Sequence, residues 1–212
     1  MSNLARWAEV WEELGLKGDP ELHADLRQRY SASARRYHTL HHLMECLELF
    51  EETRQLAEHP AEVELALWFH DAIYDVRRHD NEVRSAEWAR RELRKAGAPD
   101  TVTERVYELV MVTRHESAEP IDVDQDLLSD IDLGILGARP SRFDEYERQI
   151  REEYKHVPSP TFKAARRHVL QGFLARTRIY HTDWFFERRE RLARSNIERS
   201  LRQLSRWRLS PL

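Results

Sequence analysis

A histidine and an aspartate stand side by side at the end of the most apolar stretch of this chain. His70 and Asp71 follow the run Val63-Glu64-Leu65-Ala66-Leu67-Trp68-Phe69. An imidazole and a carboxylate in such surroundings lose hydration, which the folded protein must replace with a charged or hydrogen-bonding partner. A bound cation replaces that hydration most completely. The dipeptide therefore predicts a metal site.

Further candidate ligands lie before and after this dipeptide. The segment Tyr37-His38-Thr39-Leu40-His41-His42 precedes it by about thirty residues, and the acidic segment Ser129-Asp130-Ile131-Asp132-Leu133 follows it by about sixty. Together the three segments offer a mixed set of imidazole and carboxylate ligands. Such a set suits divalent Mn, Fe, Co, Ni or Zn better than Mg. We therefore expect a divalent first-row metal as the cofactor.

The histidines His38 and His42 are four residues apart, which is one turn of a helix. The helix expected from Arg36 to Glu58 carries apolar residues on two opposite sides. A helix of that kind is buried on both sides, so both histidines are predicted to point into the protein. His41 lies about 100° around the helix from its neighbour and is expected at the surface or behind the ligands.

The ordered set of His42, His70-Asp71 and Asp132 resembles the H…HD…D signature of the HD superfamily of metal-dependent phosphohydrolases. Within that superfamily the chain is similar to a group of bacterial proteins of about this length that are described only as predicted HD phosphohydrolases. The segments 66–75 and 130–137 carry most of that likeness.

The resemblance implies an enzyme that hydrolyses a phosphate ester or anhydride through a metal-activated water. It implies a nucleotide or another small phosphorylated metabolite as the substrate. The expected metal ligands are His42, His70, Asp71 and Asp132. Asp132 is preferred to Asp130 because its context resembles the Ala-Asp-Xaa-Leu pattern of the superfamily, whereas Asp130 could instead cap a helix.

Three residues are candidates for catalytic roles: Asp75, His38 and His115. Asp75 follows Asp71 by four residues, so it is expected on the same helix face, where it could orient or deprotonate a water. Cyclic-nucleotide phosphodiesterases, which are distant relatives by fold, have a Tyr-His with a second histidine four residues later. By that likeness His42 is the metal ligand and His38 the acid that protonates the leaving group.

His115 closes a helix expected from Thr101 to Glu116 and could bind phosphate, shuttle a proton, or join a second metal site. Together with an arginine such as Arg114, His38 or His115 would stabilise or protonate the departing oxygen. Ordinary surface positions at helix ends are the alternative for His115 and Asp75. In the HD enzymes that hydrolyse guanosine tetraphosphate, a Glu-Asp pair follows the dipeptide. Here Tyr74 replaces the glutamate, which argues against that substrate.

The composition predicts a single, nearly all-helical domain over residues 1–212. Apolar residues make up 41% of the chain and charged residues 34%, glycines number only 6, and helix-like periodicity recurs throughout. We expect an all-α globular bundle of roughly nine or ten helices. No apolar run approaches the roughly 20 residues that cross a bilayer, and the N-terminus lacks a signal-peptide core, so we expect a cytoplasmic protein with no membrane partner. Cys46 is the only cysteine, which excludes an internal disulfide and argues against a thiolate metal cluster.

The C-terminal region from about residue 161 is basic, with 13 Lys and Arg residues against 4 Asp and Glu residues. Such a region could bind nucleic acid. The pairs Glu187 with Arg191, Glu190 with Arg194 and Glu198 with Arg202 are spaced i,i+4, and this spacing favours a solvated helix face instead. The alternatives to an enzyme are an HD-like sensor that binds a metal and a nucleotide without turnover and, less favoured, a basic nucleic-acid-binding protein. The sequence leaves the oligomeric state open.

Overall fold

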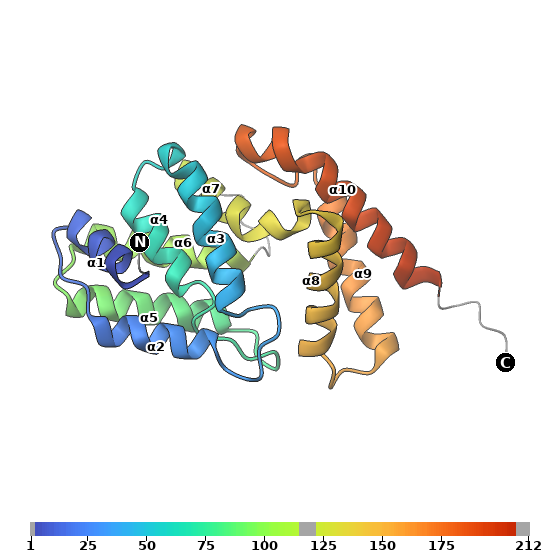
Figure 1. The fold of residues 1–212 in the computed structure, drawn as a ribbon, viewed down its shortest axis with the longest axis horizontal. Coiled ribbons are helices and arrows are strands. Elements are labelled where there is room, and N and C mark those ends of the chain that lie inside the picture. The colour runs from blue at the N-terminus through green and yellow to red at the C-terminus, as the bar shows by residue number, and fades with distance from the viewer. Residues whose placement is uncertain (1–2, 115–121, 207–212) are drawn as a thin grey trace. The chain divides into compact units, whose positions relative to one another are not determined.

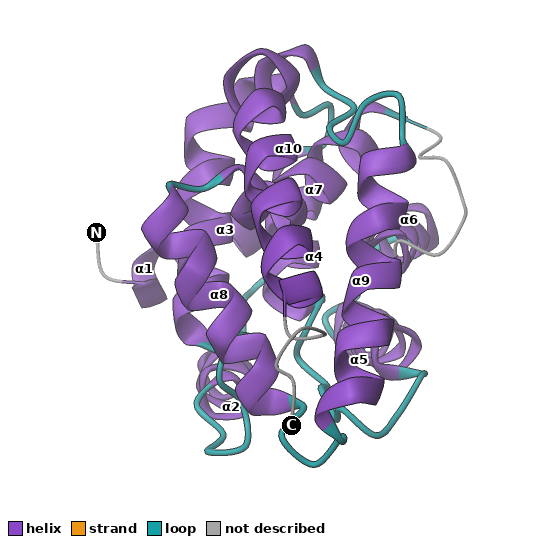
Figure 2. Cartoon of the chain, turned by 90° about the vertical axis from the view of Figure 1, so that its right-hand side faces the viewer, coloured by secondary structure: helices purple, strands orange, loops and turns teal. Residues whose placement is uncertain are grey.

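The computed structural model describes residues 3–114 and 122–206. Over these residues it contains ten α-helices, three short 3-10 helices and no strand (Figure 1; Figure 2). The predicted all-α fold of nine or ten helices is thereby confirmed. In the described part of the chain, no helix combines the length and the apolar character that crossing a membrane requires.

The chain forms two compact units, an N-terminal unit (Met1–Asp132) and a C-terminal unit (Leu133–Leu212). The N-terminal unit contains α1 (Asn3–Glu13), α2 (Pro20–Tyr30), α3 (Leu40–Thr53), η1 (Arg54–Leu56), α4 (Pro60–Phe69), α5 (Asn81–Lys95), α6 (Asp100–Met111), η2 (Val112–Arg114) and α7 (Val123–Asp132). The C-terminal unit contains η3 (Leu133–Gly137), α8 (Pro140–Glu153), α9 (Ser159–Ala175) and α10 (Asp183–Arg206). The boundary has no intervening loop, since η3 begins directly after α7, and the expectation of a single domain stays a prediction.

Helix α4 is the centre of the N-terminal unit. Nine of its ten residues are buried, and it packs against α1, α3, α5, α6 and α7. Its two glutamates are buried too, and each is paired: Glu62 accepts from Arg105 at 2.6 and 2.8 Å, and Glu64 accepts from Arg6 at 2.9 Å and from Arg54 at 2.7 Å. Buried carboxylates require such partners. These ion pairs tie the central helix to α6, α1 and η1.

Helix α4 ends at Phe69, whereas the apolar periodicity of the sequence predicts a helix from Ala61 to Tyr74. The last four backbone carbonyls of a helix have no N–H partner within the helix, so residues beyond its end or elsewhere in the chain must donate to them. All four have such donors: His70 N–H donates to Ala66 O at 2.8 Å, His70 Nδ1 to Leu67 O at 2.7 Å, Tyr30 Oη to Trp68 O at 3.2 Å, and Ala72 N–H to Phe69 O at 2.9 Å. The turn that presents His70 and Asp71 therefore completes the hydrogen bonding of the helix end.

Helix α3 begins at Leu40 and not at Arg36. Thr39 is its N-cap, and the Thr39 hydroxyl accepts from the N–H of His41 at 3.3 Å. A threonine in this role starts a helix. His38 therefore lies in the turn before α3, whereas His42 lies within its first turn.

The C-terminal unit is closed by contacts between η3, the loop after α9, and α10. The Tyr180 hydroxyl donates to Leu133 O at 3.1 Å, and the Asn196 amide donates to Leu136 O at 2.9 Å and Ala138 O at 2.8 Å. All of these groups except Ala138 are buried. The 3-10 helix is thus held against α10 by polar contacts to its backbone.

Over the described residues 161–206, the basic region lies in α9, in α10 and in the loop between them. The i,i+4 spacing predicts a solvated face for Glu190, but Glu190 is buried and accepts from the N–H groups of Ile179 and Tyr180 as well as from Arg194 at 2.7 Å. Glu190 and Arg194 therefore hold the loop before α10 in place. The exposed pair Glu198 and Arg202, at 3.8 Å, fits the solvated face that the spacing predicts.

Candidate metal centre

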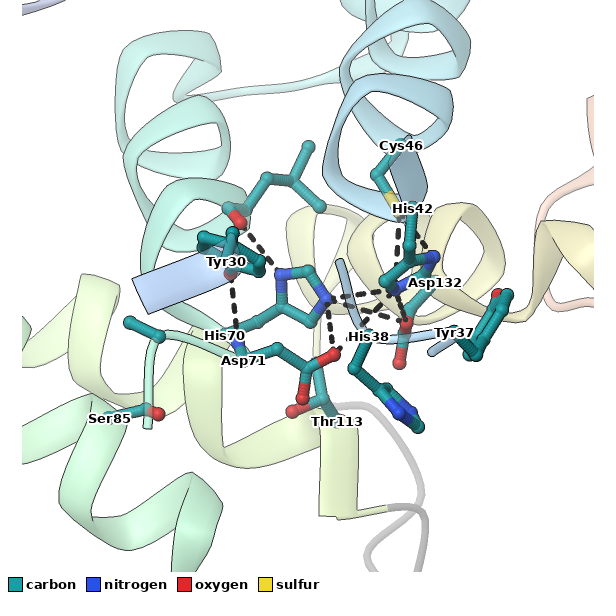
Figure 3. Close-up of polar contacts among 12 residues, drawn as sticks. Tyr30, Tyr37, His38, His42, Cys46, His70, Asp71, Ser85, Thr113 and Asp132 are labelled. Carbon is teal, nitrogen blue, oxygen red and sulfur yellow. Dashed lines mark hydrogen bonds and ion pairs between the residues drawn. The ribbon is translucent and has the colours of Figure 1, made fainter. Parts of the chain in front are cut away.

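Four residues from three segments that are far apart in the sequence converge inside the N-terminal unit (Figure 3). His42 extends from the first turn of α3, His70 and Asp71 from the turn after α4, and Asp132 from the last residue of α7. The structure therefore brings together the four side chains that the sequence predicts as metal ligands.

The donor atoms of this cluster lie close together. The Nε2 atoms of His42 and His70 are 3.2 Å apart. Asp71 Oδ2 lies 3.2 Å from His70 Nε2 and 3.7 Å from His42 Nε2. Asp132 Oδ1 lies 3.3 Å from His42 Nε2 and 3.6 Å from His70 Nε2.

These separations fit a shared divalent ion. Bonds of about 2.0 to 2.2 Å to nitrogen and oxygen place neighbouring ligand atoms roughly 3.0 to 3.6 Å apart, depending on whether the geometry is octahedral or tetrahedral. Of the five distances between the histidine nitrogens and their neighbours, four lie between 3.2 and 3.6 Å, and the fifth, from His42 Nε2 to Asp71 Oδ2, is 3.7 Å. The donor set thus matches a metal centre in both chemistry and spacing.

The ring of His70 is oriented by the end of α4. Its Nδ1 lies 2.7 Å from Leu67 O, and because a carbonyl can only accept, Nδ1 carries the hydrogen. In the neutral ring Nε2 is then left with its lone pair, directed at the cluster. A backbone partner of this kind is the usual support for a histidine that binds a metal.

The electrostatics of the cluster favour positive charge. Burial on its own would lower the pKa of His70, but Asp71 and Asp132, together with the Leu67 carbonyl, raise it to about 9. Burial would likewise raise the pKa of Asp71, yet His70, His38 and His42 hold it well below its usual range. The negative charge of the two carboxylates is therefore balanced either by a proton on His70 or by a bound cation.

A cysteine joins this group unexpectedly. His42, Cys46, His70 and Asp132 each offer a ligand atom, all within 4.8 Å of one another, so this buried set could hold a metal ion. Cys46 follows His42 by one helical turn, and its Sγ is 3.7 Å from both ring nitrogens of His42. Burial, with Asp132 and Asp71 nearby, raises the pKa of the Cys46 thiol well above its usual value. Asp71 Oδ2, which lies 3.2 Å from His70 Nε2, offers a further ligand atom beside this set.

The carboxylates form the open side of the cluster. The side chains of His42 and His70 are 3% and 1% exposed, whereas those of Asp71 and Asp132 are 14% and 15% exposed. A small molecule would therefore approach the centre past the carboxylates.

The structure distinguishes between the two candidate aspartates of α7. Asp132 reaches both histidines, whereas Asp130 lies two residues earlier, about 200° around the helix, and is fully buried. Asp130 is in the last turn of α7, so the alternative that it caps the start of a helix is wrong.

His38 lies at the edge of the cluster and is half-buried. Its ring stacks on Tyr74 with 4.1 Å between ring centroids, and its centroid is 6.0 Å from that of His42. His41 is exposed and pairs with Glu45 at 3.7 Å, in line with its expected surface position.

The expected position of Asp75 on the helix face of Asp71 is wrong, because α4 ends at Phe69. Asp75 is exposed in the following loop, where its carboxylate accepts from the N–H of Arg77 at 2.9 Å. Its role in orienting water therefore has no support from the geometry. His115 falls outside the described residues, and Arg114 is exposed at the end of η2.

Two further buried residues, Tyr30 and Arg35, contact the backbone around the cluster. The Tyr30 hydroxyl accepts from the N–H of Asp71 at 3.2 Å, and the Arg35 guanidinium donates to three carbonyls around the cluster. Tyr30 ends the apolar stripe of α2 and reads as ordinary core, while Arg35 stands in a polar loop. Neither residue carries a sequence signal that distinguishes it from its neighbours.

Comparisons of this chain with family models, with curated proteins and with solved structures find no match. The interpretation of the site therefore rests on its geometry and on the spacing of its residues.

Proposed function

We propose that this protein is a metal-dependent phosphohydrolase of the HD type. The observation that carries the proposal is the convergence of two buried imidazoles and two partly exposed carboxylates, with the Nε2 atoms of His42 and His70 3.2 Å apart. The order of these residues along the chain is the order of the HD signature.

The proposed ligands are His42, His70, Asp71 and Asp132. Their two nitrogen donors favour Mn, Fe, Co, Ni or Zn over Mg, which prefers oxygen ligands alone. When bound, a divalent cation supplies Lewis-acid chemistry, making water a stronger nucleophile near neutral pH and offsetting the negative charge of a phosphoryl group.

The chain itself supplies orientation and proton transfer. Leu67 O fixes the ring of His70, and the carboxylates of Asp71 and Asp132 line the side from which a substrate can approach. His38 lies beside that opening, stacked on Tyr74, and in its protonated form it can donate a proton to a departing oxygen. No step is assigned to Asp75, whose carboxylate accepts from the backbone of its own loop.

The proposed substrate is a phosphate ester or anhydride of a nucleotide or another small phosphorylated metabolite. This class follows from the resemblance to the HD superfamily and from the Lewis-acid chemistry of the centre. Tyr74, in place of the glutamate found in the hydrolases of guanosine tetraphosphate, argues against that compound.

Elemental analysis of the purified protein, followed by a screen for phosphate release from nucleotides and sugar phosphates, tests the proposal. Asp71→Ala should lose both metal and activity. His41→Ala is the matched control, because His41 is exposed next to His42 and should retain both. Metal binding without phosphate release from any compound would indicate a sensor, and a metal-free wild-type protein that takes up no added metal would contradict the proposal.

A further inference from the structure

We infer that Arg35 is a positioning residue of the proposed metal centre, holding the turn that presents Asp71 and the loop that carries His38. The expected effect of Arg35 on metal binding rests on the proposed function. Its effect on the backbone of these two segments does not depend on that function. Arg35 Nη1 donates to His38 O at 2.9 Å and to Asp71 O at 2.7 Å, and Nη2 donates to Ala72 O at 3.0 Å.

The position of Asp71 explains why such a residue is needed. Asp71 follows the end of α4, so the carbonyls of Asp71 and Ala72 have no place in the ladder of that helix. Unpaired buried carbonyls would cost stability and leave the turn free to move. Arg35 supplies donors to both, and its shared Nη1 links them to the loop before α3.

The guanidinium is itself held in place. Arg35 is only 6% exposed, and its Cζ lies 5.0 Å from the ring centroid of Tyr30 and 5.4 Å from that of Tyr74. Tyr30 also accepts the N–H of Asp71, and Tyr74 stacks on His38. The cation, the two tyrosines and the two loops therefore form one support behind the centre.

A lysine cannot take over this role. The planar guanidinium presents several donors in a fixed fork, whereas an ammonium is a single strongly hydrated point that reaches three separate carbonyls poorly. Arg35→Lys therefore keeps the positive charge and removes the arrangement of N–H donors that contacts the three carbonyls.

Arg194→Lys is the matched control. Arg194 also donates to three backbone carbonyls, those of Leu174, Arg176 and Thr177, at 3.1, 2.8 and 3.0 Å, but all of them belong to the C-terminal unit. Both variants lose donors to three backbone carbonyls, and Arg194→Lys also changes the ion pair with Glu190 in the C-terminal unit. Only Arg35→Lys should affect the metal centre.

The experiment measures Zn²⁺ affinity and the visible spectrum of bound Co²⁺ for the wild-type protein and both variants. Loss of an outer support typically weakens metal binding about 10- to 100-fold, and we expect that loss in Arg35→Lys alone, with a changed Co²⁺ spectrum. If Arg35→Lys does not fold, Arg35→Gln replaces it, because it keeps an N–H donor without a buried ammonium. Wild-type affinity and spectrum in the folded Arg35 variant would overturn the inference while leaving the proposed function intact.

Hydrogen exchange of residues 37–39 and 71–74 in the metal-free proteins separates the two claims. We expect faster exchange there in Arg35→Lys and wild-type exchange in Arg194→Lys. If the wild-type protein binds no metal, the proposed function fails, and this measurement alone decides the role of Arg35. Unchanged hydrogen exchange in Arg35→Lys would then overturn the inferred role of Arg35.

Discussion

The Nε2 atoms of His42 and His70 face each other at 3.2 Å in the interior of the N-terminal unit. Two imidazole lone pairs can share this space only with a hydrogen on one of the nitrogens or with a cation between them. Because the Nδ1 hydrogen of His70 is used on Leu67 O, a proton and a metal compete for the same position. The metal affinity of the centre and the pH dependence of its stability should both reflect that competition.

Asp132→Asn should remove most of the bound metal. The substitution keeps the size of the side chain but takes away the charge of a ligand that lies 3.3 Å from His42 Nε2 and 3.6 Å from His70 Nε2. We expect the affinity to fall by more than the roughly 10- to 100-fold that accompanies loss of an outer-shell partner. Metal titration of the apoprotein measures it.

Asp130→Asn is the control for that substitution. Asp130 lies on another face of α7 and is fully buried, so its amide variant should cost stability and still bind metal. The reverse pattern, with metal lost in Asp130→Asn and kept in Asp132→Asn, would identify Asp130 as the ligand in place of Asp132.

The metal-free protein should become less stable as the pH rises from neutral towards 10. The pKa of His70 is raised from 6.5 to about 9 in the folded protein, so the protonated ring stabilises the fold below about pH 6.5 and loses that contribution as the pH passes about 9. Denaturant unfolding at several pH values, with a chelator present, measures the trend.

Metal should weaken this pH dependence, because the cation replaces the proton on His70. His70→Gln should weaken it as well, leaving the smaller loss that the raised pKa of the buried Cys46 thiol contributes near pH 9. Equal slopes in the wild-type apoprotein and in His70→Gln would contradict the assignment of the proton to His70.

The fold could be predicted from the sequence because helix-forming periodicity and buried faces are local properties. Helix α4 is the clearest case: a run that is apolar on nearly every side became the central helix. Its end could not be predicted, because it depends on donors from distant residues, such as Tyr30 Oη on Trp68 O. Without those contacts in view, periodicity carried the expected helix on through Tyr74 and placed Asp75 wrongly.

The candidate ligands could be predicted because His and Asp side chains in apolar surroundings are costly to bury unless they share a partner such as a cation. The residues that support them could not. Arg35 donates to the backbone carbonyls of Asp71 and Ala72. Because every residue has a backbone carbonyl, such a contact places no constraint on the residue type that accepts it. Cys46, as a lone cysteine, predicts no thiolate cluster, although its spacing of four from His42 already places both on one face of α3.

Acid should destabilise the N-terminal unit through His23. This residue is buried between Trp7 and Trp68, with ring centroids 5.5 and 5.2 Å away, and burial, assisted by Arg27, lowers its pKa below 6.5. A lowered pKa gives stability that is present above about pH 6.5 and is lost as the pH falls through the folded value.

Urea unfolding of the metal-free protein at about pH 7.5 and about pH 5 should therefore show a larger loss of stability for the wild type than for His23→Gln. His41→Gln, which changes an exposed histidine, should retain the wild-type difference. A wild-type loss equal to that of His23→Gln would rule out His23 as the titrating group.

Two glycines of the C-terminal unit should respond in opposite directions to alanine. A Cβ at Gly137 would lie 2.6 Å from Arg189 Cβ and 3.0 Å from Arg189 O, so η3 and α10 must move apart, at a cost of about 1 to 3 kcal/mol. A Cβ at Gly172, within α9, meets nothing within 4 Å, so Gly172→Ala should add about 0.5 to 1 kcal/mol by restricting the unfolded chain. Urea unfolding of the two variants measures both changes. A Gly137→Ala protein as stable as the wild type would mean that η3 does not approach α10 as closely as the contacts of Tyr180 and Asn196 require.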